Sequence, residues 1–300
     1  MNFLRAFVAF SRPHTIIGTS LSVLGLFVVA RAFQDLPLSF NGHFWLTLFA
    51  CLSANIFIVG LNQLTDVEID RINKPDLPLA SGAFSIATGR LVVGLALLGA
   101  IFGALSGGFY LSLTVGISLM LGTLYSLPPI RLKRFHFWAA LCIFTIRGLV
   151  VNLFLFLNFM PADIPARIPG HVWALVAFMF GLSIVIAWFK DIPDHAGDRQ
   201  FKIRTLTVIL GPNRVFGFGN LLLISCYLGM VVLSLKGLAG INNWILGIGH
   251  ALPILLIFWR MRRVEPQKPS SITRYYLFVW MLFFFEYLLF PAACYWGNPA

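Results

Sequence analysis

Two short acidic motifs with the same spacing occur far apart in the sequence. Residues 62–74 and residues 190–202, whose starts are 128 positions apart, both contain the pattern D-x-x-x-D-R-x-x-K. The two stretches hold six of the 11 Asp and Glu residues in the 300-residue chain. Two ionised carboxylates one helical turn apart repel each other and weaken a helix, so such a pair usually has a bound cation. The repetition therefore points to a divalent cation that carries a phosphate.

The first motif combines an amide with two carboxylates. In a helix, Asn62, Asp66 and Asp70 occupy one face at positions i, i+4 and i+8. Ligands that offer only oxygen select a hard cation, and Mg²⁺ commonly takes one or two carboxylates together with phosphate oxygens. We therefore expect a magnesium site at this face.

The second motif offers the equivalent carboxylates one turn apart. Lys190 stands where the first motif has its Asn, and Asp191 is either a further metal ligand or a helix cap. Pro193 fits the first turn of a short helix or a break in the chain. The predicted Mg²⁺ ligands are Asn62, Asp66, Asp70, Asp191, Asp194 and Asp198, and all of these except Asp191 form the predicted catalytic set.

Basic residues flank both acidic motifs. Fixed cations beside a bound metal can hold a diphosphate and stabilise it as it leaves. The alternative is that these residues only orient the chain in a membrane, and this alternative weighs more for residues 131–134 and 260–263 than for the basic residues duplicated in register. The predicted diphosphate-binding residues are Arg71, Lys74, Arg131, Lys190, Arg199 and Lys202.

The composition indicates that these motifs are positioned by membrane-spanning helices. Hydrophobic residues make up 59% of the chain and charged residues 11%, against roughly 25% charged residues in a soluble domain. Mean hydropathy is +0.86. A spanning helix needs about 20 mostly apolar residues. Nine spans are predicted, at residues 14–30, 44–64, 91–107, 109–127, 138–158, 171–189, 214–235, 243–259 and 275–296.

The basic residues are distributed unequally between the two sides of these spans. With nine spans, 18 of the 22 Lys and Arg residues lie on the side of the N-terminus and three on the other. By the positive-inside rule, the N-terminus and both acidic motifs face the cytoplasm. Membrane orientation therefore explains the net charge of +11, and no nucleic-acid partner is expected. A bacterial inner membrane or a thylakoid membrane is the expected location.

Four predicted spans separate the two acidic motifs, so both motifs have the same orientation. This spacing predicts a single domain over residues 1–300 with a parallel four-helix duplication, in which residues 1–135 match 136–263 and the ninth helix, 275–296, is appended. A cation or lipid transporter is disfavoured, because inverted repeats with mid-span acidic residues are typical of many secondary transporters. A structural subunit of a photosynthetic membrane leaves the repeated motif unexplained.

Two ionisable residues lie inside predicted spans. Arg147 and Glu286 each cost free energy in a membrane unless they are paired or face a polar cavity. They either pair with each other or line the pocket of an aromatic substrate. With Asn152 and Tyr125, they are the candidates for the acceptor site or the cavity.

The motifs together resemble the UbiA-type membrane prenyltransferase family over essentially the whole chain. More narrowly, segments resemble the homogentisate phytyltransferases of that family; they lie at residues 11–18, 60–63, 70–75, 77–82, 125–134, 147–148, 190–194 and 197–203. The resemblance implies an all-α bundle around a central cavity that opens sideways to lipid. It also implies a cyanobacterial thylakoid or plasma membrane with the active site facing the cytoplasm.

The resemblance further implies a reaction. The acidic motifs would hold Mg²⁺ on phytyl diphosphate, and the basic residues would bind its oxygens. Loss of diphosphate leaves an allylic cation, which aromatic side chains favour in a pocket sheltered from water. The ring of homogentisate attacks that cation, and loss of CO₂ gives a methyl-phytyl quinol of the tocopherol pathway. A geranylgeranyl or solanesyl donor, or another aromatic acceptor, remains open, because the sequence does not reveal the length of the tail pocket.

Overall fold

The chain folds into a bundle of helices in the computed structural model, which describes residues 3–161, 168–201 and 203–297. Within these residues there is no strand, only one isolated bridge between Phe135 and Arg204. The helices are α1 (Phe3–Phe10), α2 (Pro13–Phe33), α3 (Gly42–Thr65), α4 (Val67–Asn73), α5 (Ile86–Ser106), α6 (Phe109–Ser126), η1 (Leu132–Arg134), α7 (His136–Phe144), η2 (Thr145–Val150), α8 (Val151–Asn158), α9 (Gly170–Gln200), α10 (Leu206–Leu210), α11 (Pro212–Lys236), α12 (Asn243–Met261) and α13 (Pro269–Tyr295).

Nine segments of the described chain are helical, long and apolar enough to cross a membrane. The fifth combines α7, the π-helical turn η2 and α8 into one span, His136–Asn158. The predicted number of spans is therefore confirmed. The prediction that Pro193 lies in the first turn of a short helix or at a break is wrong, because α9 continues through this residue to Gln200. Proline removes one backbone hydrogen bond, and the residues on either side of it, Ile192 and Asp194, are both buried against the rest of the bundle.

Local sequence signals begin and end many of these helices. The side chains of Asn41 and Ser85 cap α3 and α5 by accepting hydrogen bonds from backbone N–H groups of the first turn, each at 3.0 Å. Asn242 caps α12 in the same way. Gly108 adopts a φ of 93°, which favours glycine, and this conformation allows the short turn between α5 and α6. The turn falls at the boundary between the predicted spans 91–107 and 109–127.

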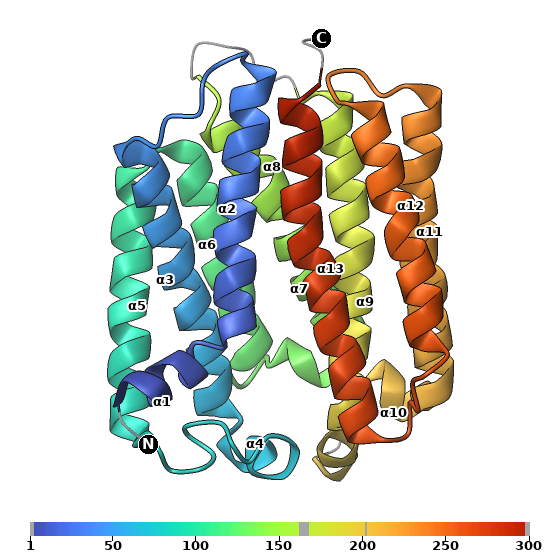
Figure 1. The fold of residues 1–300 in the computed structure, drawn as a ribbon. Coiled ribbons are helices and arrows are strands. Elements are labelled where there is room, and N and C mark those ends of the chain that lie inside the picture. Colours follow the sequence, from blue (N-terminus) through green and yellow to red (C-terminus); the bar gives the residue numbers. More distant parts are fainter. Residues whose placement is uncertain (1–2, 162–167, 202, 298–300) are drawn as a thin grey trace.

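The helices lie side by side around a buried centre (Figure 1). Helices α9 and α13 are the most buried of the spans: 72% and 61% of the residues in their most apolar 18-residue stretches are buried, against 22% for α5. On α5, Leu91, Leu95, Leu98, Phe102 and Leu105 recur every three or four residues and are each more than half exposed. Such a stripe on an outer helix suits contact with lipid chains.

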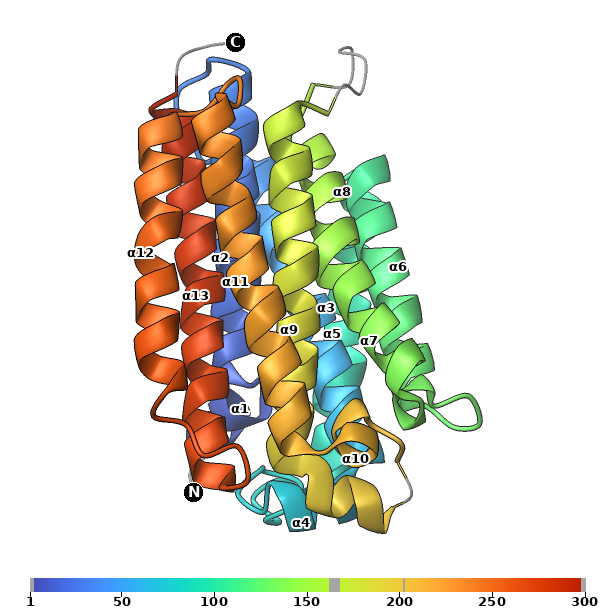
Figure 2. The same cartoon turned by 90° about the vertical axis from the view of Figure 1, so that its right-hand side faces the viewer.

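Both acidic motifs lie at the same end of the bundle. The N-terminus, α1, α4 and α10 gather there, and the C-terminus lies at the opposite end (Figure 1). The view turned by 90° shows that α9 runs down to this end beside α4 (Figure 2). The prediction that the motifs share one end is therefore confirmed, and it creates the conditions for a shared site.

Candidate active site

Two adjoining cavities lie at the acidic end of the bundle. The larger, of about 220 Å³, has mostly apolar walls from α2, α3, α6, the fifth span, α9 and α13. The smaller, of about 50 Å³, has polar walls from α3, α4, α9 and the loop after α6. Arg12, Asn62, Tyr125 and Lys190 line both cavities. A polar chamber therefore opens onto an apolar one.

All six predicted metal ligands line the smaller cavity: Asn62, Asp66, Asp70, Asp191, Asp194 and Asp198. The second motif lies on the continuous helix α9, where a spacing of three to four residues keeps its carboxylates on one face. The first motif does not form the expected single helical stripe. Helix α3 ends at Thr65, Asp66 has non-helical backbone angles, and α4 begins at Val67.

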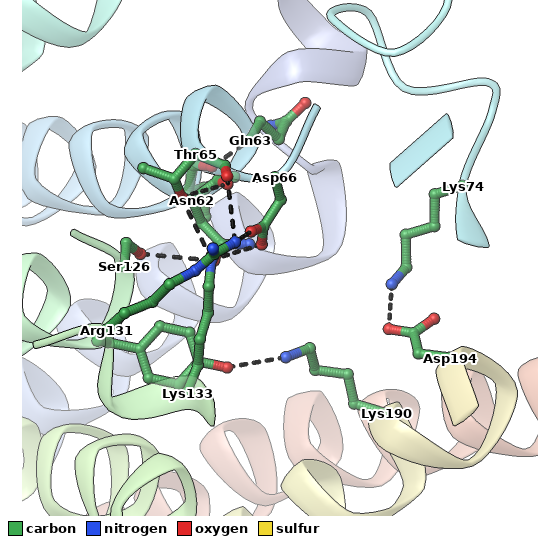
Figure 3. Close-up of polar contacts among 12 residues, drawn as sticks. Asn62, Gln63, Thr65, Asp66, Lys74, Ser126, Arg131, Lys133, Lys190 and Asp194 are labelled. Carbon is green, nitrogen blue, oxygen red and sulfur yellow. Dashed lines mark hydrogen bonds and ion pairs between the residues drawn. The ribbon is translucent and has the colours of Figure 1, made fainter. Parts of the chain in front are cut away.

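The break at Asp66 allows two cations to reach its carboxylate (Figure 3). Arg131 donates to one oxygen of Asp66 at 2.7 Å, and Lys133 donates to the other at 2.5 Å. Lys133 also donates to the side-chain oxygens of Asn62 at 3.0 Å and Thr65 at 3.2 Å. The side chains of the first motif are therefore oriented by these contacts with Arg131 and Lys133, and not by a continuous helix.

Lys133 is a site residue that the sequence motif does not distinguish from its neighbours. It is 7% exposed and lines the smaller cavity, whereas the adjacent Arg134 is exposed. The short turn η1 points the two side chains in different directions. Burial lowers the pKa of Lys133 from its ordinary value to about 8, and the carboxylate of Asp66 opposes this shift.

Helices α4 and α9 are joined across the smaller cavity. Lys74 forms an ion pair with Asp194 (Figure 3). The side-chain oxygen of Asn73 accepts a hydrogen bond from the backbone N–H of Gly197 at 3.1 Å. Burial raises the pKa of Asp70, on the same short helix, to about 6, and nearby Arg12 and Lys74 limit this rise. The two acidic motifs therefore converge on one small volume.

The predicted diphosphate-binding residues do not all reach this volume. Lys74 and Lys190 line the cavity, and Arg131 contacts it through Asp66. Arg71 instead pairs with the exposed Glu68 at 2.8 Å, because the residue after Asp70 is rotated by about 100° toward the outer face of α4. Arg199 is likewise exposed on α9. Lys202 lies outside the described residues.

The smaller cavity has the donor chemistry of a site for a hard divalent cation. Its ligand candidates offer oxygen only. Among residues 3–161, 168–201 and 203–297, no group of three or more His, Cys, Asp or Glu side chains lies close enough together to hold a metal ion. The carboxylates of Asp66 and Asp194 instead contact Lys and Arg side chains. The residue types fit Mg²⁺, and these internal cations are what a metal ion would displace.

Of the four candidates for the acceptor site, two line the larger cavity. Tyr125 accepts a hydrogen bond from Lys190 at 3.0 Å where the cavities meet, and Arg147 lies over the ring of Trp280, 4.6 Å from its centroid. Asn152 is fully buried and lines neither cavity; its side chain forms hydrogen bonds with the backbone of Arg147 and Gly148 and with the hydroxyl of Tyr287.

The suggested pair between Arg147 and Glu286 is wrong. Glu286 is fully buried away from both cavities, and its carboxylate lies 3.0 Å from the ring of His250. Helices α12 and α13 place these two side chains face to face, so a carboxylate inside a membrane span has a basic ring beside it. Within the described residues, the facing nitrogen of His250 and both oxygens of Glu286 make no hydrogen bond.

Arg12 is a second site residue that sequence reasoning missed. It precedes Pro13 at the start of α2, has a φ of 52°, and lines both cavities. The Arg-Pro step at the start of the first span is the signal that could have identified it, since proline at the first helical position fixes where the preceding side chain stands.

Comparisons with known proteins agree with this geometry. The model of the UbiA prenyltransferase family matches residues 19–282. The chain is 47% identical to the homogentisate phytyltransferase of Synechocystis sp., with 99% of this chain and 98% of that protein covered. It is 40% identical to homogentisate phytyltransferase 1 of Arabidopsis thaliana, with 96% and 75% covered, and 39% identical to the homogentisate geranylgeranyltransferase of Triticum aestivum, with 96% and 72% covered.

A solved structure has the same fold. It is a UbiA homolog from Archaeoglobus fulgidus bound to GPP and Mg²⁺, and it matches with a TM-score of 0.66 at 18% identity over 96% of this chain and 99% of that one. The nine apolar helices among the described residues and these matches identify an integral membrane protein. The chain belongs to the UbiA prenyltransferase family.

Proposed function

We propose that this protein transfers the phytyl group of phytyl diphosphate to homogentisate with loss of CO₂, giving 2-methyl-6-phytylbenzoquinol for tocopherol biosynthesis. The observation that carries the proposal is the pair of adjoining cavities, one acidic and polar, the other apolar. A substrate with a charged head and a long hydrocarbon tail fits such a pair. The names of the relatives from Synechocystis sp. and Arabidopsis thaliana support homogentisate and phytyl as the two partners.

The polar cavity would hold the diphosphate and its metal ion. Bound Mg²⁺ would neutralise charge on the diphosphate and make it a better leaving group. The Archaeoglobus fulgidus homolog, solved with GPP and Mg²⁺, supports this assignment. The residues proposed to hold the ion are Asn62, Asp66, Asp70, Asp191, Asp194 and Asp198.

Basic side chains of the same cavity would bind the diphosphate oxygens. Lys74 and Lys133 each contact a carboxylate that lines the cavity. When metal and diphosphate occupy the cavity, each ammonium can exchange its carboxylate for a phosphate oxygen nearby. Arg12 and Lys190 line both cavities, which supports a role for them in stabilising the negative charge that would develop as the diphosphate departs.

The apolar cavity would hold the tail and the aromatic acceptor. Its walls exclude water from the allylic cation left by ionisation, and the faces of Tyr125 and Trp280 favour that cation. The new bond joins carbon 1 of the phytyl group to a ring carbon of homogentisate, which loses its proton. The acetate side chain loses CO₂ and takes up a proton to become a methyl group.

The site would open to the cytoplasm of a cyanobacterial cell, in the thylakoid or plasma membrane. Most Lys and Arg residues lie on the side of the bundle that carries the acidic motifs, which supports this orientation. The relative from Synechocystis sp. supports a cyanobacterial setting.

The test uses the purified protein in lipid vesicles. Vesicles receive homogentisate and Mg²⁺ with phytyl, geranylgeranyl or solanesyl diphosphate in separate reactions, and products are identified by mass spectrometry. We expect the phytyl product in the largest amount and none after chelation of the metal. A higher kcat/KM for another donor would replace phytyl in the assignment, and no product with any of the three donors would overturn the proposed function.

A further inference from the structure

Arg147 is a cation inside the bundle that has no anionic partner among the residues that the structure describes. It belongs to the fifth span and lines the larger cavity. In the described part of the chain, its guanidinium makes no hydrogen bond or ion pair, and its one close partner is the Trp280 ring, 4.6 Å away. A charge within a span is costly unless it is paired or faces a polar ligand. An anion in the cavity would supply the missing partner.

A buried polar network holds the segment that carries Arg147. The π-helical turn η2 spans Thr145–Val150, and π-helical turns often mark functional sites because they redirect a side chain. The amide of Asn152 donates to the backbone oxygens of Arg147 at 2.7 Å and Gly148 at 2.9 Å. The hydroxyl of Tyr287 on α13 donates to the Asn152 oxygen at 2.8 Å. Two side chains therefore fix the turn.

Gly148 provides a further restraint on the same turn. A Cβ at this position would lie 2.6 Å from the Cα of Phe180, so the turn packs directly against the backbone of α9. The turn is therefore held between α9 and α13, and Arg147 is presented from a rigid segment.

The surroundings of Arg147 suit a flat aromatic acid. Trp280 is 2% exposed, and its indole N–H has no hydrogen-bond partner in the described structure. The ring of His14 lies edge-on to Trp280 with centroids 5.0 Å apart, and both residues line the cavity. Aromatic faces can hold a ring while a guanidinium holds a carboxylate through two parallel hydrogen bonds.

The charges that line the larger cavity are all of one sign. Arg12, Arg147 and Lys190 line it, with the titratable side chains of His14, Tyr125 and Tyr276, and no described Asp or Glu does. Arg12 and Lys190 also line the smaller cavity, whereas Arg147 lines only the larger one. Arg147 is therefore separated from the proposed diphosphate site, and a second anion is its natural ligand.

We propose that Arg147 binds the carboxylate of the aromatic acceptor beside Trp280, and that Asn152 and Tyr287 are positioning residues that hold the turn carrying it. The inference rests on the proposed function, in which homogentisate brings that carboxylate. It explains how an acidic acceptor enters an apolar cavity in one orientation, with its carboxylate at Arg147 and its ring toward the end where the allylic carbon forms.

The first test compares homogentisate with its neutral methyl ester on the unaltered protein. The shift in melting temperature of the protein in detergent is measured over a titration with each compound. Because loss of one partner from a buried charged pair typically corresponds to roughly 30-fold or more in affinity, we expect the acid to bind roughly 30-fold more tightly than the ester. Equal affinity for acid and ester would overturn the inference, whether or not the enzyme turns over.

The second test uses Arg147→Leu, with Arg147→Lys as the variant that keeps the charge. For Arg147→Leu we expect the KM for homogentisate to rise roughly 30-fold or more, the KM for phytyl diphosphate to stay within about two-fold, and the preference for the acid over the ester to vanish. Arg147→Lys should retain part of that preference. An unchanged KM for homogentisate, or an equal rise in both KM values, would contradict the assignment. Failure of the unaltered protein to form product would count against the proposed function alone.

The third test addresses the positioning residues. Tyr287→Phe removes only the hydroxyl that binds Asn152. We expect the KM for homogentisate to rise several-fold, with kcat and the KM for phytyl diphosphate unchanged, because the effect passes through the orientation of Arg147. A purely structural role would lower the melting temperature and change both KM values together, and that result would remove these two residues from the proposal.

Discussion

Replacing Lys133 by Met, and Arg134 by Met as a matched control, separates a site residue from its neighbour in the same basic loop. Both substitutions remove one positive charge at the same end of the bundle, so they weaken the membrane-orienting charge bias equally. Only Lys133 is buried and contacts Asp66, and Arg134 is exposed. The structure therefore predicts very different effects from two adjacent and chemically similar changes.

The size of the effect follows from the contacts of the Lys133 ammonium. It makes one hydrogen bond to the charged Asp66 and two to the neutral oxygens of Asn62 and Thr65. In the proposed complex the ammonium would donate to a charged phosphate oxygen in place of Asp66. Such a hydrogen bond contributes about 1.5–3 kcal/mol, which corresponds to roughly 10- to 150-fold in kcat/KM. Asp66 keeps its contact with Arg131 in the variant, so the carboxylate is not left without a cation.

The assay measures kcat/KM for phytyl diphosphate at saturating homogentisate in lipid vesicles, with thermal melting as a check of folding. We expect Lys133→Met to lower kcat/KM roughly 10- to 150-fold and Arg134→Met to change it by less than about two-fold. Equal losses in the two variants would show that the loop acts only through its total charge. An unaltered kcat/KM in Lys133→Met would refute the placement of its ammonium at the site.

Three further predictions test other parts of the structure. Asp194→Asn should lower kcat by about 100-fold or more and raise the Mg²⁺ concentration needed for half-maximal rate, and an unchanged Mg²⁺ titration would exclude it as a ligand. Gly197→Ala would place a Cβ 2.3 Å from the side-chain oxygen of Asn73 on α4, so it should lower the free energy of unfolding by about 1–3 kcal/mol and reduce the rate. Gly217→Ala is the control, because the space around Gly217 is open, and it should change neither quantity. Glu286→Leu should lower the free energy of unfolding by about 3–5 kcal/mol without changing the KM for homogentisate, because His250 loses its buried partner. The double variant with His250→Leu should recover that stability, since the buried pair is then replaced as a whole. Urea or thermal unfolding in detergent measures the stability of the two variants.

Much of the fold follows from the sequence, because a bilayer restricts what a chain can do. Backbone groups in hydrocarbon must be bonded within the chain, so an apolar stretch of about 20 residues there becomes a helix. The count of nine spans, the turn at Gly107 and Gly108 and the shared end of the two acidic motifs are therefore predictable. The duplication of residues 1–135 in residues 136–263 stays a prediction.

The partners of individual charges were not predictable from the sequence. Spacing treats Lys133 and Arg134 alike, but only the first turns toward Asp66. Spacing also groups Arg71 with Lys74, yet a rotation of about 100° per residue sends Arg71 outward and leaves Lys74 on the cavity. Such distinctions depend on which helix faces which.

The sequence by itself determined the nine apolar spans found in the described residues and the position of both acidic motifs at one end, since hydrophobicity and helical periodicity are properties of consecutive residues. Only the tertiary structure decided that Glu286 lies beside His250, while Arg147 faces an apolar cavity and has no anionic partner among the described residues. The physical reason is that the neighbours of a buried charge come from other helices, and only helix packing decides which side chains those helices bring to it.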